Sequence, residues 1–590
     1  MAVLFMSPLA VGSPYYTSVM IFLGIHAILA TGLGLLMGQA GQTSLGQAAF
    51  YAVGAYVSGV LTARYGISPW ISLVLAVGVS LLLAFLIGVP ALRLQGYYFA
   101  MATLGFGIIV QIVVEEIRWL TGGVSGLSGI PTLSMMAWAL DTDLKYFYVV
   151  WGMFGGLFVA AINIVHSRVG NSLRALHWDE AAADILGVRT YRYKLQILLV
   201  SVVYASLAGS LYAHYITFLG PEVFGFMLSV KLAVMVVVGG MQSLWGPIFG
   251  AILFTWLPEY LRAYKDYDII IFGTILILTM MFMPKGIAYG FGAVARRAVS
   301  IGFRPLERED SQAAKGITPE VVRLVESRGR EGVSGPLLYV RGLGKSFGGV
   351  RAIHNLTFAV EPRQIKGIIG PNGAGKTTLF NLINGQFNTF DGEISFEGFR
   401  LNGCPPHRIA RLGIGRTFQN VRLFPDLSVL ENVIVACAAW SSSGFPQEIF
   451  RMRSARAEER EVLDRARHCL SFVGLEAEAS RVASGLAFGT QRRLEIARAL
   501  AANPRLLLLD EPAAGLDPSE MRNLVDLIYR LRREGVTVLL IEHKMDLVMQ
   551  ICDQIVVLNH GQKIAEGTVK EIQNNDAVIS AYLGDGTPAA

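Results

Sequence analysis

The sequence predicts an α-helical polytopic membrane domain followed by a soluble α/β domain in one chain. Of the 590 residues, 53% are hydrophobic and only 16% are charged, whereas soluble domains contain roughly 25% charged residues. The apolar residues are concentrated in the first half of the chain. We therefore expect three parts: a transmembrane domain over residues 1–295, a linker over 296–336 and a soluble domain over 337–590.

The membrane domain is expected to contain about eight to ten helical segments. A helix that crosses a bilayer needs about 20 mostly apolar residues. Seven stretches satisfy this requirement: 16–37, 47–63, 69–89, 97–114, 145–165, 194–214 and 267–283. The apolar stretch 228–258 is interrupted by Gly239-Gly240 and Gly246-Pro247, so it predicts either two short crossings or a re-entrant hairpin. Such breaks are tolerated in a membrane only where protein or a cavity surrounds them.

Basic residues predict the orientation of the chain. The loop 166–194 and the segment after the last helix both carry clusters of them: Arg168, Arg174, Arg189, Arg192, Lys194, Lys285, Arg296 and Arg297. By the positive-inside rule both regions are cytoplasmic, and so is the soluble domain that follows. The net charge of +6 fits such loops and gives no reason to expect a nucleic-acid partner. We expect a multi-pass protein of a bacterial inner or plasma membrane.

Small and polar residues within the spans point to close helix packing and to a polar interior. Small residues let helix backbones approach closely in lipid, and seven glycines are candidates for such contacts: Gly32, Gly34, Gly38, Gly41, Gly54, Gly105 and Gly107. Polar side chains gather over 42–47. Gln111 lies within a span, where hydrogen bonding between helices and contact with a substrate are equally good interpretations.

The loop segment 172–188 is amphipathic, with apolar residues placed among charges. A loop that is only solvated does not need this pattern. The pattern therefore favours a short helix that docks into a groove of a partner domain.

The soluble domain carries a phosphate-binding loop. The apolar strand 365–369 is followed by GPNGAGKTT and then by a helical run, which is the strand–loop–helix context that the motif requires. Backbone N–H groups of the loop and the helix N-terminus would cradle the phosphates of ATP. The expected nucleotide-binding residues are Gly370, Pro371, Asn372, Gly373, Ala374, Gly375, Lys376, Thr377 and Thr378. Lys376 should reach the β- and γ-phosphates, and the Thr377 hydroxyl should bind Mg²⁺.

Two further apolar strands end in ionisable residues. The run RLLLLDE ends in Asp510, which is placed to hold Mg²⁺, and Glu511, which is placed to polarise the attacking water. The run VTVLLI is followed by Glu542 and His543. The carboxyl end of a parallel strand faces the ligand crevice, although a histidine there is by itself a weak signal.

Together these motifs resemble the ATP-binding-cassette (ABC) family over residues 337–584. That resemblance implies a coupled ATPase in which Phe347 stacks on adenine, Gln419 senses magnesium and the permease, and His543 contacts the γ-phosphate. It also identifies Asp517 with the D-loop. The loop Leu486-Ala487-Phe488-Gly489-Thr490 stands where the family has LSGGQ.

This signature loop departs from the family pattern. Ala487 replaces the usual serine, Phe488 a glycine and Thr490 a glutamine, whereas Gly489 is retained. The lost hydroxyl would have donated a hydrogen bond to a γ-phosphate, and such bonds to charged groups contribute roughly 1.5–3 kcal/mol. We therefore expect the composite site that this loop completes on a partner to be weakened.

Other segments resemble branched-chain amino acid ABC importers. In the membrane half they are 38–56, 93–107, 120–131 and 172–188, and in the soluble half 415–433, 486–500 and 571–584. The resemblance implies that 172–188 is a coupling helix, with Glu180, Ala181, Ala182 and Gly187 as a loose match to the importer motif. It also implies two permeases and two ATPases, from a second subunit of each kind or a homodimer. A separate extracytoplasmic solute-binding protein is expected as well.

Three alternative functions remain open from the sequence. The substrate could be another small solute, such as urea or an amide. The chain could be half of an exporter, although exporters usually have longer cytoplasmic helix extensions than the segment 166–194 offers. It could also be an ATP-gated regulator, although a broken helix with gathered polar residues favours a transport path.

Overall fold

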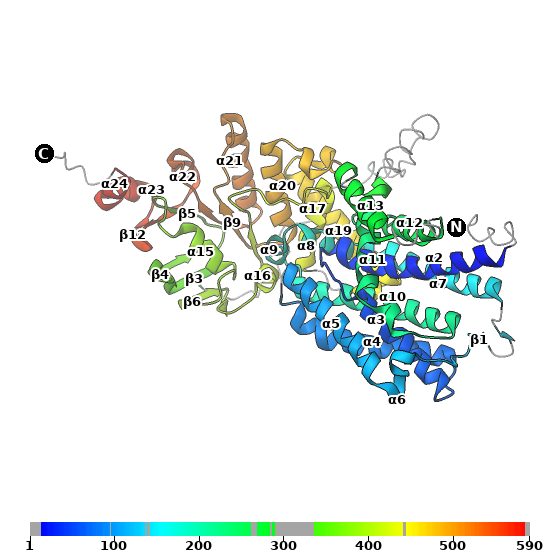
Figure 1. The fold of residues 1–590 in the computed structure, drawn as a ribbon. Coiled ribbons are helices and arrows are strands. Elements are labelled where there is room, and N and C mark those ends of the chain that lie inside the picture. Colours follow the sequence, from blue (N-terminus) through cyan, green and yellow to red (C-terminus); the bar gives the residue numbers. More distant parts are fainter. Residues whose placement is uncertain are drawn as a thin grey trace. The chain divides into compact units, whose positions relative to one another are not determined.

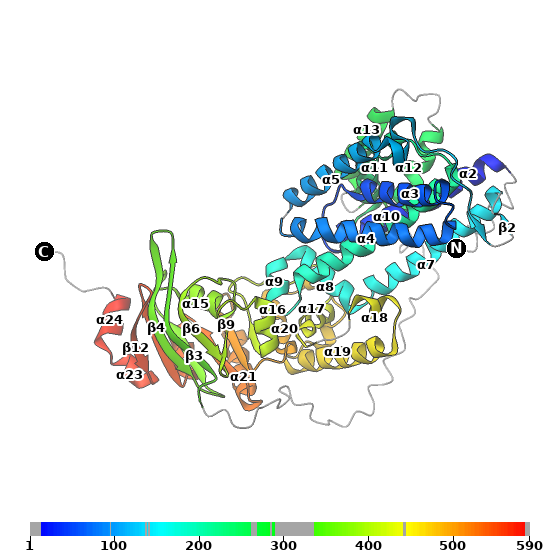
Figure 2. The same cartoon turned by 90° about the horizontal axis from the view of Figure 1, so that it is seen from below.

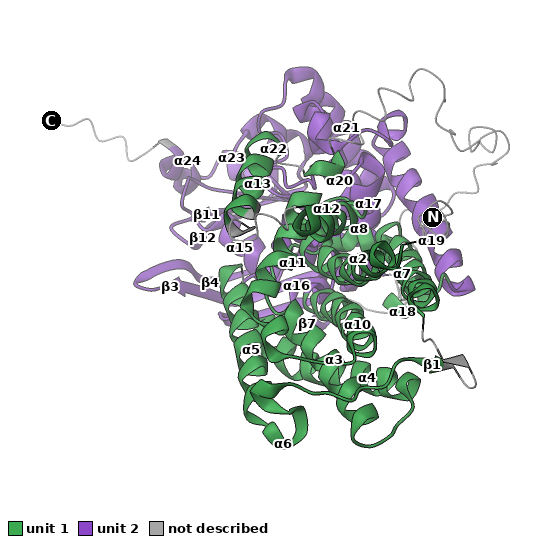
Figure 3. Cartoon of the chain, turned by 45° about the vertical axis from the view of Figure 1, so that its right-hand side comes forward, with its two compact units in different colours: residues 1–173, 191–315, 444–451 green, residues 174–190, 316–443, 452–590 purple. Residues whose placement is uncertain are grey.

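The chain folds into two compact units that exchange short segments. The computed structural model describes residues 13–94, 96–135, 138–139, 142–260, 268–283, 286–289, 335–440 and 444–583 (Figure 1). Unit 1 comprises residues 1–173, 191–315 and 444–451, and unit 2 comprises residues 174–190, 316–443 and 452–590 (Figure 3). Residue 267 at the start of the last expected span, most of the expected linker, and Lys285, Arg296 and Arg297 lie outside the described residues.

Unit 1 is built almost entirely from apolar helices. They are α2 (Pro14–Gly34), α3 (Gln47–Ala63), α4 (Pro69–Ala91), α5 (Tyr97–Glu116), α6 (Arg118–Thr121), α7 (Asp143–Val165), the start of α8 (Arg168–Trp178), α10 (Thr190–Ile216), α11 (Phe226–Gly239), α12 (Gly246–Tyr260), α13 (Asp268–Phe282) and α18 (Phe445–Ile449). The short turns η1 (Leu35–Gln39), η2 (Gly123–Ser125) and η3 (Pro221–Phe224), and the two-residue strands β1 (Ser134–Met135) and β2 (Trp138–Ala139), complete it.

All seven continuous spans expected from the sequence coincide with helices α2, α3, α4, α5, α7, α10 and α13. Within the described residues, five helices are long and apolar enough to cross a membrane on their own: α2 extended by η1, α4, α5, α7 and α10. The helical membrane domain predicted from the hydropathy pattern is confirmed.

The interrupted stretch forms a pair of short helices. Helices α11 and α12 contain 14 and 15 residues, which corresponds to roughly 21 and 23 Å of helix. Both are shorter than the hydrocarbon core of about 30 Å. They pack against each other at their glycines, because a Cβ on Gly250 would lie 1.8 Å from the Met235 carbonyl oxygen. This geometry favours the hairpin over two full crossings.

Most of the glycines singled out in the sequence are packing glycines. A Cβ added at Gly32 would lie 2.6 Å from Tyr204 Cβ, and one added at Gly34 would lie 2.5 Å from Pro247 Cγ. A Cβ added at Gly38 would lie 1.8 Å from the Met241 carbonyl oxygen. At Gly54 it would meet Ser206 O at 2.3 Å. The packing interpretation is wrong for Gly105, which has no atom within 4 Å of such a Cβ, and Gly107 has only one, at 3.9 Å.

Polar groups within the spans are largely satisfied by neighbouring elements. Gln47 on α3 and Ser201 on α10 exchange hydrogen bonds of 3.1 Å. Gln111 donates instead to Glu115 Oε1, one turn along its own helix, at 3.0 Å. Neither sequence-based interpretation anticipated this contact for Gln111.

Unit 2 contains two sheets. The six-stranded sheet has the order β12 (Gln562–Gly567), β11 (Gln554–Asn559), β5 (Ile365–Ile369), β10 (Thr537–Ile541), β9 (Leu506–Asp510) and β8 (Ile414–Arg416). The four-stranded sheet has the order β4 (Val350–Val360), β3 (Leu338–Phe347), β6 (Asp391–Phe396) and β7 (Phe399–Arg400). Every residue of β5, β9 and β10 is buried, as expected for parallel strands covered on both faces.

Helices surround these sheets (Figure 2). They are α15 (Lys376–Ile383), α16 (Pro406–Leu412), α17 (Val429–Ala436), α19 (Arg453–Phe472), α20 (Phe488–Ala501), α21 (Pro518–Arg533), α22 (Met545–Ile551), α23 (Val569–Gln573) and α24 (Asp576–Leu583), with short turns η5 (Cys437–Ala439), η6 (Glu476–Glu478) and η7 (Ala483–Gly485). Residues 174–190 contribute the end of α8 and helix α9 (Glu180–Ile185) to unit 2. Leu379 and Phe380 of α15 pack into one hydrophobic core with residues of both sheets.

We expect Gly250→Ala to destabilise the hairpin of α11 and α12. The added methyl group would overlap a backbone carbonyl that cannot rotate away, and overpacking of this kind costs roughly 1–3 kcal/mol. The melting temperature of the purified protein should fall. Gly155→Ala on α7 is the matched control, because nothing lies within 4 Å of a Cβ at that position. Equal melting temperatures for both variants would contradict the packing role of Gly250.

Candidate ATP site and its link to a permease loop

The phosphate-binding loop joins β5 to α15 and is shaped by glycines. Gly370 and Gly375 have φ angles of +153° and +95°, values that side chains rarely adopt. A Cβ on Gly370 would also lie 2.1 Å from the Leu558 carbonyl oxygen of the neighbouring strand β11. Between these glycines, Asn372 and Gly373 are exposed. The loop therefore turns tightly against the sheet and leaves its outer rim accessible.

Lys376, the first residue of α15, is held by its own loop. Its Nζ donates to the carbonyl oxygens of Gly370 and Pro371, at 2.7 and 3.0 Å. Burial lowers the pKa of Lys376, and the nearby carboxylates of Glu511 and Asp510 oppose that shift. The lysine is thus positioned over the loop in which phosphates would bind, with Thr377 and Thr378 following it on the helix.

Three strands bring the remaining motif residues to one edge of the sheet. Strand β10 lies between β5 and β9, parallel to both. In this register Ile541 pairs with Ile368 on one side and with Asp510 on the other. The phosphate-binding loop, the Asp510–Glu511 pair and His543 therefore all follow the carboxyl ends of adjacent strands.

Glu511, Gln419 and His543 meet at this edge. Gln419 Nε2 donates to Glu511 Oε2 at 3.0 Å, and His543 Nδ1 lies 3.5 Å from Glu511 Oε1. Glu511 has a φ of +48°, a conformation uncommon for a residue with a side chain. Its backbone N–H donates to the Ile541 carbonyl oxygen of β10 at 2.9 Å. The sequence indicated each residue separately, and the structure brings their side chains together.

Asp510 has one carboxylate oxygen available for a cation. Its Oδ2 accepts a hydrogen bond from Arg416 Nη2 at 3.1 Å, whereas its Oδ1 is buried without a hydrogen-bond partner among the described residues. Burial raises the pKa of Asp510, and Arg416 opposes that shift. A buried carboxylate oxygen with no partner fits a Mg²⁺ ligand, because hard cations take oxygen donors.

Arg416 is a site residue that sequence reasoning missed. Its side chain is buried, with Nη1 donating to Asn381 Oδ1 on α15 at 2.7 Å and Nη2 to Asp510. Arg416 thus joins α15 to the end of β9. Only its place in the segment GRTFQN hinted at the site, since an arginine on a short strand has no motif of its own.

Helix α20 fixes the loop that carries Gln419, and this connection was also missed. Arg492 Nη1 donates to the Phe418 carbonyl oxygen at 2.7 Å, and its Nη2 donates to the Gln419 carbonyl oxygen. Glu495 Oε1 accepts from the Phe418 N–H at 3.0 Å. Arg498 Nη1 donates to the Arg422 carbonyl oxygen at 2.6 Å. All three side chains are buried, so the position of the Gln419 loop follows α20.

The signature loop leads directly into α20. Ala487 is the N-cap residue of α20 and has no side chain that could cap it. Phe488 is exposed, and Arg492 Cζ lies 5.3 Å from the centre of its ring. A Cβ on Gly489 would lie 1.9 Å from Glu520 Oε1, so the retained glycine leaves room for the Glu520 carboxylate, which would have to move aside for a larger residue. Leu486 is buried, and Thr490 Oγ1 accepts a weak hydrogen bond of 3.4 Å from Arg493.

Two further residues expected at the site, Phe347 and Asp517, make local contacts of their own. Phe347, at the end of β3, is partly exposed and packs edge-to-face on Phe387, with ring centres 5.1 Å apart. Asp517 caps α21, accepting hydrogen bonds from the N–H groups of Ser519 and Glu520 at 2.7 and 2.8 Å. The hydrogen bond from the Glu520 N–H lowers the pKa of Asp517 most, and the Ser519 hydroxyl, which donates to the same oxygen at 2.7 Å, comes next.

The amphipathic segment belongs to unit 2 from residue 174 onward. It forms the end of α8 and helix α9, separated at Asp179, whose side chain caps α9 through the Ala182 N–H at 2.9 Å. Ala182 is buried, whereas Ala181 is exposed. Gly187 has a φ of +93°, and a Cβ there would lie 2.7 Å from Ala439 Cα. Of the four residues that match the importer motif, Ala182 and Gly187 are therefore small because neighbouring atoms leave no room for a larger side chain.

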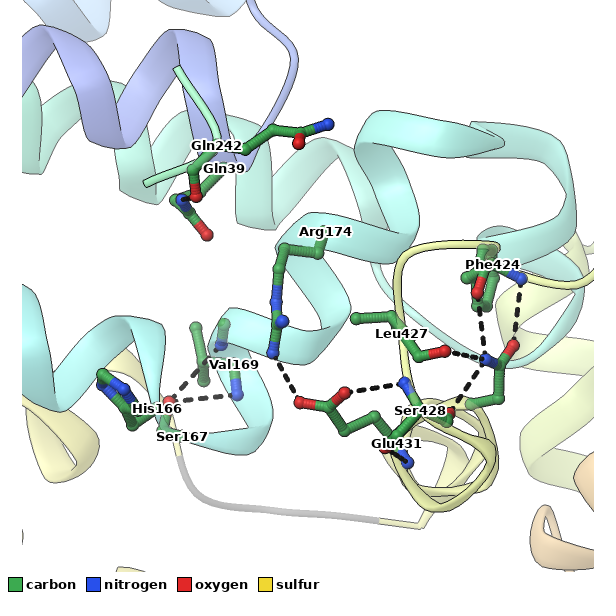
Figure 4. Close-up of polar contacts among 12 residues, drawn as sticks. Gln39, His166, Ser167, Val169, Arg174, Gln242, Phe424, Leu427, Ser428 and Glu431 are labelled. Atoms are coloured by element: carbon green, nitrogen blue, oxygen red, sulfur yellow. Dashed lines mark hydrogen bonds and ion pairs between the residues drawn. The ribbon is translucent and has the colours of Figure 1, made fainter. Parts of the chain in front are cut away.

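Charged contacts join this segment to the cassette part of unit 2. Arg422 Nη1 donates to Asp179 Oδ2 at 3.1 Å, and His407 Nδ1 lies 2.8 Å from Asp184 Oδ1. Arg174 Nη2 donates to Glu431 Oε1 at 2.9 Å, and Glu431 also completes the capping box of Ser428 (Figure 4). Burial raises the pKa of Glu431, but Arg174 and Ser428 outweigh it, so the pKa is lowered overall.

Comparisons with known proteins match each half of the chain to a family. Residues 15–283 match the family described as branched-chain amino acid transport system, permease component. Residues 353–514 match the ABC transporter family, and residues 562–588 match the branched-chain amino acid ATP-binding cassette transporter family. A nucleotide-free ATP-binding cassette from an ABC transporter aligns at 31% identity and a TM-score of 0.38, covering 42% of this chain and 100% of that one.

Curated relatives that are ATP-binding proteins match this chain over their whole length. The BraF protein of Pseudomonas aeruginosa, a high-affinity branched-chain amino acid transport ATP-binding protein, is 48% identical over 254 residues, which is 43% of this chain and 100% of BraF. LivG of Escherichia coli, of the same description, is 47% identical over the same shares of both chains. The resemblance inferred from the motifs is confirmed. The chain belongs to the branched-chain amino acid ABC transporter family and joins a permease component to an ATP-binding component in one polypeptide.

Proposed function

We propose that this chain is the permease-plus-ATPase half of an importer that moves branched-chain or related amino acids across a bacterial inner membrane. One observation carries the proposal. Arg422, three residues after Gln419, binds Asp179 in the permease segment that folds with unit 2. A change in the position of Gln419, at the edge of the sheet where the γ-phosphate would bind, can therefore reach a permease loop through few residues.

The residues at the strand edge suit ATP hydrolysis. Lys376 and the loop from Gly370 to Thr378 would hold the phosphates, and Glu511 would polarise the attacking water while Gln419 and His543 orient it. When bound, Mg²⁺ would neutralise phosphate charge, held by Thr377, Gln419 and Asp510. Because phosphoryl transfer depends mainly on positioning and charge stabilisation, the convergence of these groups supports the proposal.

The proposed cycle requires partners. ATP binding would close two cassettes, each completing the site of the other through its signature loop and D-loop, with Asp517 in that role here. The segment 174–190 would follow its cassette and switch the permease between access states. Reopening would follow hydrolysis. A second permease and a second ATPase, or a second copy of this chain, together with an extracytoplasmic binding protein, complete the proposed assembly.

Substrate range is assigned by family membership. Relatives of the ATP-binding part are described as branched-chain amino acid transport proteins. The alternatives of another small solute, an exporter half and a non-transporting regulator make different predictions for uptake. Binding-protein-dependent uptake of leucine, isoleucine or valine into vesicles tests the proposal directly. ATP turnover that no solute or binding protein affects would contradict it.

We expect Glu511→Gln to reduce ATP turnover at least about 100-fold, the usual scale for a general base, while ATP still binds. The amide keeps the size of the side chain but cannot accept a proton from water. Turnover of the assembled complex and binding of labelled ATP measure the two effects. Glu534→Gln, at an exposed position at the end of α21, is the control. Unchanged turnover in a complex that depends on this site would remove the assigned role.

We expect Arg422→Gln to lower solute uptake per ATP hydrolysed about fivefold, within the range reported for residues in coupling networks. The substitution removes the charge that binds Asp179, while the contact is partly exposed and contributes little to stability. Uptake and ATP hydrolysis are measured in the same proteoliposomes. Arg532→Gln, which breaks a similarly exposed ion pair with Asp553, should leave the ratio unchanged. Equal ratios for the two variants would argue against this route.

We expect Ala487→Ser to stabilise unit 2 by about 0.5–2 kcal/mol, because a serine at this position can cap α20. The same hydroxyl would restore a hydrogen bond to the partner's nucleotide, so ATP affinity of the assembled complex should rise. Thermal unfolding and ATP titration measure the two effects. Ala457→Ser, at an exposed position within α19, should not stabilise. A drop in both stability and affinity for Ala487→Ser would refute the cap interpretation.

A further inference from the structure

A short piece of the cassette sequence is folded into unit 1. Residues Gly444–Arg451 follow η5 and precede α19, two elements of unit 2, yet they belong to the compact unit of the membrane helices (Figure 3). Their helix, α18, packs beside α7 (Figure 2). This segment mirrors 174–190, which is permease sequence folded into unit 2.

The apolar side of α18 is part of the membrane-unit core. Phe445 is 4% exposed and belongs to the hydrophobic cluster formed by the membrane helices, and Ile449 packs against that cluster. The ring of Phe445 lies edge-to-face on Tyr193 of α10, with ring centres 5.7 Å apart. A large aromatic side chain buried in this way is a strong anchor.

A buried ion pair fixes the same segment. Arg168 Nε donates to Glu448 Oε1 at 2.9 Å, and the two side chains are 7% and 5% exposed. Charges are rarely buried unless they are paired, and removal of one partner leaves the other in an unfavourable site. The ion pair therefore fixes the position of α18 against Arg168, the first residue of α8.

A third contact holds the end of α18. Asn163 Nδ2 on α7 donates to the Ile449 carbonyl oxygen at 2.9 Å, and carbonyl groups in the last turn of a helix lack partners within the helix. The three anchors come from α7, α8 and α10. These helices precede and follow the segment 174–190. Helix α18 therefore contacts the permease at both ends of that segment.

We propose that α18 is a second mechanical link between ATP hydrolysis and the permease, anchored by the pair Arg168–Glu448. This inference rests on the proposed transport function. When the helical part of the cassette moves, α17 and α19 pull on the chain at both ends of α18, and α18 transmits that displacement to α7 and α10. Arg168, Glu448 and Asn163 are positioning residues in this scheme, because none of them lies at the nucleotide edge.

Neutral substitutions at the ion pair test the link. We expect Glu448→Gln and Arg168→Gln each to lower solute uptake per ATP hydrolysed about tenfold, with ATP turnover within about twofold of the unmodified complex. The double variant should be no worse than either single variant, because each single variant already removes the Arg168–Glu448 ion pair. Glu459→Gln, an exposed acid on α19, is the matched control. An unchanged ratio in the single variants, or additive losses in the double variant, would overturn the proposal.

A second measurement does not depend on transport. Amide hydrogen exchange of the full complex should show that Glu448→Gln removes protection from residues 445–449, while protection of α20 is retained. Retained protection at 445–449 together with an unchanged ratio overturns the link. If the charge variants fail to fold, Asn163→Ala removes only the hydrogen bond to Ile449 and should give a smaller loss in the same ratio. No loss there would equally overturn the link.

The two proposals can fail separately. If the unmodified complex hydrolyses ATP but takes up no amino acid, the proposed function fails. In that case the change in ATP turnover on adding the binding protein is compared between the unmodified complex and Glu448→Gln, and this change replaces uptake as the measure of the α18 link. If the unmodified complex transports and Glu448→Gln transports with the same ratio, only the second link fails.

Discussion

The parallel pairing of β5, β10 and β9 is the constraint on which the site depends. Because β10 is hydrogen-bonded to both neighbours, the end of β5 is held in one register with the ends of β9 and β10, which lie much later in the sequence. Parallel strands buried on both faces leave no freedom to slip without exposing apolar side chains. The phosphate-binding loop, Asp510 with Glu511, and His543 therefore meet at one edge without direct contacts among all of them.

A buried network of charges extends from this edge toward the permease segment. Helix α20 holds the backbone around Gln419 through Arg492 and Glu495, and Arg498 holds the backbone of Arg422. Arg422 in turn binds Asp179. Buried charged groups are stable only with their partners in place, so the buried part of this network, formed by Arg492, Glu495 and Arg498, moves as a body. The Arg422–Asp179 pair that follows it is partly exposed. The signature loop, which precedes α20, is part of the same body.

Chain exchange between the two units gives the fold its second organising feature. Permease residues 174–190 fold with the cassette, and cassette residues 444–451 fold with the membrane helices. Both exchanged segments are held by ion pairs that include an arginine of α8, namely Arg174–Glu431 and Arg168–Glu448. A helix with a charged anchor in each unit is suited to transmit displacement, and the buried Arg168–Glu448 anchor is not readily replaced by water.

The sequence by itself determined the helical spans, the phosphate-binding loop and the motif residues at strand ends, because hydropathy and local spacing act over short stretches of chain. It also indicated that 172–188 would dock, through its amphipathic pattern. Only the tertiary structure decided that Arg416 binds Asp510, that α20 holds the Gln419 loop and that α18 joins the membrane unit. Those contacts join residues far apart in the chain, and no local sequence pattern distinguishes a buried arginine or glutamate from an exposed one.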